Sequence, residues 1–109
     1  MALDIACHHT TLTDGLREAV EQKLARVQSH ASETMEGRVV LTVEPHRHLA
    51  EATVRVGKLR AHARAEAPSM YSAIDKLAAR LDRAIRKHKV HMARTAQPGA
   101  LSVRDLPTF

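Results

Sequence analysis

The chain has 109 residues, the size of one ordinary domain, and its only cysteine, Cys7, excludes an intrachain disulfide and suits a reducing cytosol. No stretch approaches the roughly 20 apolar residues of a membrane span, and the first residues lack the apolar run of a signal peptide, so we expect a cytoplasmic protein. Residues 1–54 hold five Lys/Arg and eight Asp/Glu, whereas residues 55–94 hold eleven and three, an asymmetry typical of a protein with a polyanionic partner.

The first third of the chain predicts a strand followed by a helix. Alternation of apolar residues over 3–7 is typical of a short strand, and Thr13 is a suitable N-cap for a helix from about Asp14 to His30. Four apolar residues at helical spacing form its buried stripe: Leu16, Val20, Leu24 and Val27. One flank of this stripe carries Lys23, Arg26 and His30.

Residues 38–66 predict three strands with short connections. The first strand covers 38–44 and ends at Pro45, residues 46–49 form a loop, and the second strand covers 50–56. Gly57-Lys58 makes a tight turn into a third strand over 59–66, and Gly37 is placed in the connection before the first. We expect an antiparallel meander with one covered face and one face in water.

Pro68 ends the last of these strands, and Ser69 is a good N-cap for a long helix that runs to Arg94. The order β-α-β-β-β-α predicts an α+β fold, a two-layer sandwich with both helices on one face of a four-stranded sheet. Residues 1–94 would form this domain. Residues 95–109 lack periodicity and contain two prolines and a glycine, which predicts a flexible C-terminal tail.

The long helix has an apolar side and a basic side. At about 100° per residue, its apolar residues centre roughly 140° from Lys76, whereas Arg80, Arg83, Lys87 and Arg94 fall within about 40° of it. We call Lys76, Arg80, Arg83 and Lys87 the basic strip. Asp75 and Asp82 lie off this strip, whereas a merely solvated helix face tends to mix charges in i,i+4 pairs. We therefore favour a binding surface over a solvated face.

Two further inferences concern this surface. If the flank with Lys23, Arg26 and His30 faces the long helix, the basic edges of both helices border one groove. Tyr71 and Phe109 are the only aromatic residues, so stacking of bases is not the expected mode of binding. The expected mode of binding is therefore recognition of the backbone and shape of structured RNA by Lys and Arg.

The segment MYSAIDKLAARLDRAIRKHK, residues 70–89, resembles a helix of the short ribosome hibernation promoting factors, also called sigma-54 modulation or ribosome-associated inhibitor proteins. The resemblance continues through Thr13-x-x-Leu16-Arg17-Glu18, Lys23-Leu24, Val43-Glu44 and Glu51-Ala-Thr, and covers roughly residues 1–91. It implies the same β-α-β-β-β-α sandwich, similar to a double-stranded-RNA-binding domain.

The resemblance also implies a function. Members bind the small ribosomal subunit at its 16S ribosomal RNA, in the channel for messenger and transfer RNA at the decoding region. This inhibits translation and, together with ribosome modulation factor, promotes dimerisation of idle 70S ribosomes into 100S particles. The ribosomal-RNA contacts that the resemblance implies are Lys23, Arg26, Lys76, Arg80, Arg83, Arg86, Lys87 and Lys89. Off the ribosome we expect a monomer.

The sequence departs from the family pattern in three places. The hairpin at Gly57-Lys58 is shorter than the usual loop, and Ser69 and Ser72 replace a commoner acid and alanine. Arg60 and Arg64 make the open sheet face more basic than the family leads us to expect, which leaves a second RNA-facing surface open.

Other functional classes have weaker support. The histidine pairs His8-His9, His46-x-His48 and His88-x-x-His91 lack a Cys pair, and Glu44 is the only obvious additional ligand, so we expect no metal and no other cofactor. Cys7 alternates with apolar residues, as an inert core thiol does, and no Gly-rich phosphate loop or compact carboxylate pair indicates an enzyme. The remaining alternative is a protein-binding modulator of sigma-54-dependent transcription.

Overall fold

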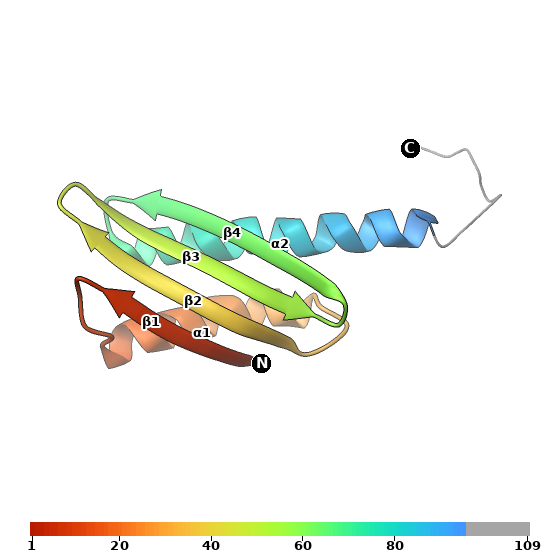
Figure 1. The fold of residues 1–109 in the computed structure, drawn as a ribbon, viewed down its shortest axis with the longest axis horizontal. Coiled ribbons are helices and arrows are strands. Elements are labelled where there is room, and N and C mark those ends of the chain that lie inside the picture. Colours follow the sequence, from red (N-terminus) through yellow and green to blue (C-terminus); the bar gives the residue numbers. More distant parts are fainter. Residues whose placement is uncertain (96–109) are drawn as a thin grey trace.

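The computed structural model describes the backbone of residues 1–95 and the side chains of residues 1–87. It confirms the predicted order of elements (Figure 1). They are β1 (Ala2–His8), α1 (Asp14–Ser29), β2 (Met35–Glu44), β3 (Arg47–Val56), β4 (Leu59–Ala67) and α2 (Met70–Thr95). The predicted tail falls outside the described residues from 96 onward.

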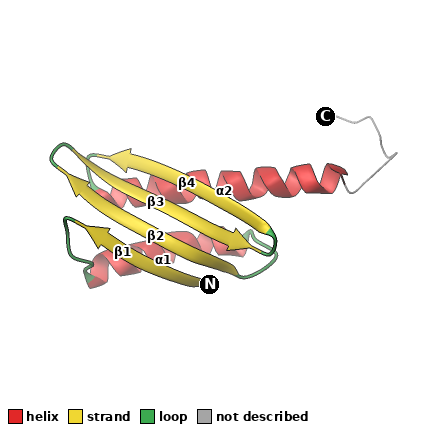
Figure 2. Cartoon of the chain, in the orientation of Figure 1, coloured by secondary structure: helices red, strands yellow, loops and turns green. Residues whose placement is uncertain are grey.

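The strands form one sheet in the order β1-β2-β3-β4. The meander β2-β3-β4 is antiparallel, as predicted, and β1 pairs with β2 in parallel, since α1 carries the chain back across the sheet between them. Both helices lie on the same face of this sheet, so the molecule has two layers (Figure 2). The α+β sandwich expected from the order of elements is therefore confirmed.

Two strand boundaries differ from the prediction. The loop expected at 46–49 is only a two-residue turn, because Arg47 already pairs with Glu44 across the hairpin. Gly37 lies inside β2 rather than before it, paired with Leu3 on one side and Val54 on the other. A β-carbon at Gly37 would collide with the Thr53 carbonyl oxygen and lie 2.7 Å from the Val54 Cα. Glycine is thus required here by the close approach of β3, and not by a turn.

The core lies between the sheet and the helices. The predicted stripe of α1 is buried, and α2 contributes its own apolar side, comprising Met70, Ile74, Leu77, Leu81 and Ile85. Packing of α2 is mainly on β4, whose inward side carries four alanines after the partly buried Leu59: Ala61, Ala63, Ala65 and Ala67. Such a surface allows the helix to approach the strand closely. Leu81 is fully buried in this interface, at 0% exposure.

Both helices begin where the sequence predicts. The Leu16 amide donates to the Thr13 hydroxyl over 3.1 Å, and the Ser72 amide donates to the Ser69 hydroxyl over 3.2 Å. These side chains satisfy amides that have no partner within the helix. The hairpin between β3 and β4 has Gly57 at a φ of 62°, a left-handed conformation that favours glycine at the first position of a two-residue turn.

Replacement of Leu81 by Ala should lower the free energy of unfolding by roughly 2–5 kcal/mol, because it leaves a cavity beneath α2. Urea denaturation of both proteins measures this difference. Arg83→Ala, on the exposed side of the same helix, is the control and should change stability by no more than about 0.5 kcal/mol. Equal effects of the two changes would show that the rotation of α2 is different from that described.

Replacement of Gly37 by Ala should cost about 1–3 kcal/mol, the usual effect of forcing an extra methyl group into packed structure. The strain arises because the backbone of β3 has to move away from β2. Thermal unfolding should show a lower Tm for this variant, whereas Ser32→Ala, in the exposed loop before β2, should unfold like the parent. A Gly37→Ala protein as stable as the parent would contradict the close approach of the two strands.

Candidate nucleic-acid interface

The basic strip lies on the exposed side of α2 that does not face α1, and its first residues lie beside the edge strand β4. All four of its residues are exposed, which agrees with the helix angles calculated from the sequence. Among the described residues, none of the four forms an ion pair with a carboxylate. The two acids of α2, Asp75 and Asp82, turn instead toward α1. The outer side of α2 therefore presents positive charge that carboxylates do not neutralise.

The first two residues of the strip also contact the edge of the sheet. Arg80 donates a hydrogen bond to the Arg64 carbonyl oxygen over 2.7 Å, and the Lys76 amine lies 3.5 Å from the Glu66 carbonyl oxygen. Both acceptors belong to β4, an edge strand whose main chain is only half paired. Arg83 and Lys87 make no such contact with described residues. They are the members of the strip most available to an external phosphate.

A groove of about 220 Å³ separates the two helices, which run in parallel. The flank of α1 with Lys23, Arg26 and His30 does face α2, so this part of the expectation was right. The residues of α2 across the groove are Asp75, Ala78, Ala79 and Asp82, and not the basic strip. The expectation that two basic edges border one groove is therefore wrong, because the rotation that buries Leu77 and Leu81 directs the acidic side of α2 toward α1.

An ion pair and a histidine–carboxylate contact bridge this groove. Lys23 lies 2.7 Å from Asp75, and His30 lies 2.8 Å from Asp82, which also binds Arg86 at 3.1 Å. Sequence reasoning did not predict these pairs. The sequence did contain a signal: His30 follows Lys23 by seven positions, and Asp82 follows Asp75 by seven positions. Two parallel helices in register would bring such equally spaced residues together.

The predicted RNA contacts thus fall into three groups. Arg26, Arg83 and Lys87 have no ion pair with described residues, Lys23 and Arg86 are paired with acids, and Lys76 and Arg80 reach the edge of β4. Lys89 lies in α2 beyond the described side chains.

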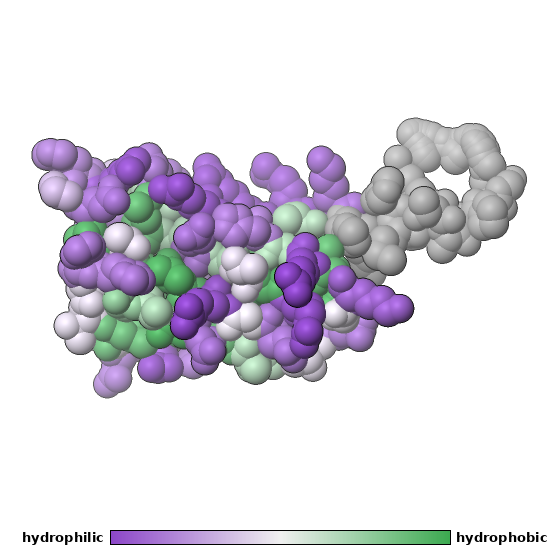
Figure 3. Space-filling model, viewed as in Figure 1, coloured by the Kyte–Doolittle hydropathy of each residue, from purple (hydrophilic) through white to green (hydrophobic). Residues whose placement is uncertain are grey.

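The open face of the sheet is charge-balanced rather than basic. Figure 3 shows it with hydrophilic and apolar side chains interleaved. Arg55 pairs with Glu36 at 2.7 Å, and His62 with Glu51 at 2.9 Å. Arg47 binds Glu44 at 2.7 Å and Glu66 at 3.0 Å, and the Glu44 hydrogen bond and charge raise the pKa of this guanidinium. These interspersed acids reduce the support for a second RNA-facing surface at Arg60 and Arg64.

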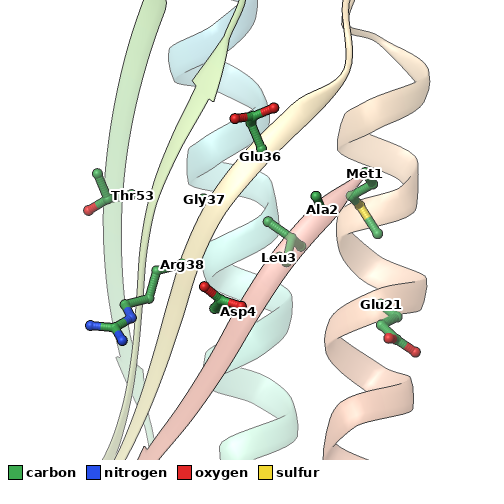
Figure 4. Close-up of a pocket in the computed structure, with 9 residues that line it drawn as sticks. All are labelled: Met1, Ala2, Leu3, Asp4, Glu21, Glu36, Gly37, Arg38 and Thr53. Atoms are coloured by element: carbon green, nitrogen blue, oxygen red, sulfur yellow. The ribbon is translucent and has the colours of Figure 1, made fainter.

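A larger hollow of about 750 Å³ lies beside the start of β1. Its charged residues are Asp4, Glu21, Glu36 and Arg38, so three carboxylates would oppose a phosphate. Figure 4 shows that Arg38 and Thr53 extend to one side of the hollow and Met1 and Glu21 to the other. The polar groups that line this hollow do not converge on a common point, as they do in a preformed ligand-binding pocket.

The residues considered for metal or nucleophilic chemistry are described only in part, since the side chains of His88 and His91 lie outside the described residues. Within residues 1–87, no group of three or more His, Cys, Asp or Glu side chains is placed to hold a metal ion. Burial raises the pKa of the Cys7 thiol, which keeps it protonated and unreactive near neutral pH. No helix of the described part of the chain is long and apolar enough to cross a membrane.

The chain was compared with known proteins. Residues 3–92 match the family described as Sigma 54 modulation protein / S30EA ribosomal protein. A ribosome hibernation promoting factor of Azotobacter vinelandii is 40% identical over 89 residues, which cover 82% of this chain and 83% of the relative. The factor of the same name from Escherichia coli K12 is 38% identical over 89 residues, covering 82% of this chain and 94% of the relative.

Solved structures agree with these sequence relatives. The N-terminal domain of Thermus thermophilus Protein Y superposes with a TM-score of 0.75 at 26% identity, covering 81% of this chain and 99% of that domain. A ribosomal subunit interface protein of Coxiella burnetii has a TM-score of 0.76 at 24% identity over 83% of this chain and 99% of its own, a likeness of fold. Because the family match spans nearly all of the described domain, this chain belongs to the Sigma 54 modulation protein / S30EA ribosomal protein family.

Proposed function

We propose that this protein is a ribosome hibernation factor that binds the small ribosomal subunit through its helical layer. The contacts are to the backbone of 16S ribosomal RNA, in the channel that messenger and transfer RNA occupy at the decoding region. Binding there inhibits translation and, together with ribosome modulation factor, promotes dimerisation of idle 70S ribosomes into 100S particles. Off the ribosome the protein is a monomer in the cytoplasm and needs no cofactor.

The observation that carries the proposal is the exposed basic strip, which lacks carboxylate partners among the described residues. Its four residues extend over 11 positions of α2, or roughly 16 Å at the rise of an α-helix. Lys and Arg at this spacing can neutralise several phosphates along an RNA backbone, and each contact releases condensed counterions. The names of the relatives, ribosome hibernation promoting factor and ribosomal subunit interface protein, support the ribosome as the source of that RNA.

The ion pairs suggest a ranking of the contacts. Arg83 and Lys87 are exposed and have no carboxylate partner in the described part of the chain, so they lose no interaction when they bind a phosphate. Lys23 has to exchange Asp75 for the phosphate, although its 38% exposure makes this a weak pair. We therefore assign the larger share of the binding free energy to the outer strip and a smaller share to the groove.

Reversal of two charges, Arg83→Glu with Lys87→Glu, should weaken binding to small ribosomal subunits by orders of magnitude. The reason is that the strip loses two phosphate contacts and gains two repulsive charges, and binding that depends on counterion release falls steeply with salt. Co-sedimentation with purified small subunits over a salt series measures the loss. Both sites are exposed, so stability should change by only about 0.5 kcal/mol per site, which thermal melts verify.

The matched control is Arg38→Glu with Arg60→Glu, which changes the net charge equally but on the open sheet face. This pair should bind subunits nearly as well as the parent. If the sheet-face variant loses binding and the folded helix-face variant retains it, the proposed interface is on the wrong layer.

A protein-binding role in sigma-54-dependent transcription is the alternative, and the words "Sigma 54 modulation protein" in the family description are what suggests it. The two functions differ in their partner. Association with subunits that disappears at high salt supports the RNA-binding function, because it reflects phosphate contacts. Binding to a protein partner in the absence of RNA, with no association with subunits at any salt concentration, would support the alternative.

A further inference from the structure

The four residues of the basic strip differ in how firmly the protein holds them. Nη1 of Arg80 donates a hydrogen bond to the Arg64 carbonyl oxygen over 2.7 Å. The Lys76 amine lies 3.5 Å from a carbonyl oxygen of the same strand, which is the limit for such a bond. Arg83 and Lys87 have no hydrogen bond to described residues. Within the described part of the chain, Arg80 is therefore the member of the strip that a short hydrogen bond holds in place.

This contact follows from the way α2 lies along β4. The strand is at the edge of the sheet and pairs with β3 alone, so every second residue turns its carbonyl group away from the sheet. The helix follows β4 after a short connection and runs back beside it (Figure 1). Lys76 consequently lies beside Glu66, and Arg80 lies beside Arg64, further from the connection. The free edge thus supplies a carbonyl acceptor at the level of Arg80.

A carbonyl partner holds the guanidinium of Arg80 without neutralising its charge. The carboxylate of Asp75, in contrast, cancels the charge of Lys23 across the groove. Arginine has five N–H donors, and the Arg64 carbonyl uses one of them, on Nη1. Nε and Nη2 have no partner among the described residues, and together they form an edge of the fork that binds phosphate through two parallel hydrogen bonds. Arg80 is exposed, so an external phosphate has access to it.

Holding a side chain before binding changes which partners it favours. An untethered arginine gives up rotamer freedom when it binds a phosphate, and this loss weakens the association. Arg80 gives up much of that freedom when the protein folds, because its hydrogen bond to β4 already restricts the guanidinium. A restricted fork gains most from a phosphate whose position is also fixed, as in folded RNA. With a flexible single strand, the RNA itself has to become ordered to match the fork.

We propose that Arg80 is a specificity-determining residue, which favours structured RNA over flexible single strands because β4 holds its guanidinium in place. Arg83 and Lys87, which are not held, attract any polyanion. This inference rests on the proposed function and assigns its discrimination between RNAs to one side chain. If the hydrogen bond served only to cover the edge of β4 against pairing with another strand, Arg80 would have no special part in that discrimination.

The test measures binding of Arg80→Lys to purified small ribosomal subunits and to poly(U), a flexible single strand, over a salt series. Lysine keeps the charge, so the slope of log K against log[salt] should not change. Its compact ammonium cannot form the fork, so affinity for subunits should fall by about two- to tenfold at every salt concentration, and affinity for poly(U) by much less. The matched variant, Arg83→Lys, should change both affinities by the same factor. A folded Arg80→Lys protein with the affinity ratio of the parent would overturn the proposal.

Nitrogen-15 relaxation of the arginine Nε–H groups tests the hydrogen bond without any RNA. In the free protein the Arg80 side chain should be more ordered than that of Arg83, and equal mobility would overturn the inference. The two proposals can fail separately. If the double reversal at Arg83 and Lys87 binds subunits like the parent, the proposed interface fails whatever Arg80 does. If the reversal abolishes binding but Arg80→Lys keeps the parent's preference for subunits over poly(U), only the role of Arg80 fails.

Discussion

The close packing of α2 on the alanine face of β4 is the constraint on which the rest of the structure depends. Four alanines line the inward side of β4, and Leu77 and Leu81 of α2 are buried at 0% exposure. A helix turns by about 100° per residue, so burial of these leucines fixes the direction of every other side chain of α2. The same packing that stabilises the core therefore sets the basic strip outward and brings Arg80 within hydrogen-bonding distance of β4.

The parallel arrangement of the helices decides which charges remain available. Since β1 and β2 are parallel strands joined by α1, and α2 follows β4, both helices run in the same direction along one face of the sheet. Positions seven residues apart on α1 then meet positions seven residues apart on α2. The two acids of α2 neutralise Lys23 and Arg86 rather than the outer strip. Within the described residues, the basic strip on α2 is consequently left without carboxylate partners.

The two layers of the domain have different electrostatic characters. Acids and bases are interspersed on the open sheet face, where Arg47 and Arg55 pair with glutamates and His62 contacts Glu51, so the charges there largely balance. Exposed pairs of this kind contribute at most about 1 kcal/mol each to stability. Their larger consequence for the proposed function is that the described part of the open sheet face offers a polyanion less net positive charge than the basic strip does. The salt dependence of binding should therefore report on the helical layer almost alone.

The sequence by itself determined the order of elements, the two-layer fold, the buried stripes and the outward basic strip, because these follow from local periodicity and capping. It misplaced Gly37 and the start of β3, where pairing with neighbouring strands overrides local preference. It could not decide the partners of Lys23 and His30, since polar contacts between helices depend on their relative direction and rotation. Only the tertiary structure decided these partners. The reason is that packing on the sheet fixes the rotation of α1 and of α2 about their own axes, and neither helix sequence alone determines how the two rotations combine.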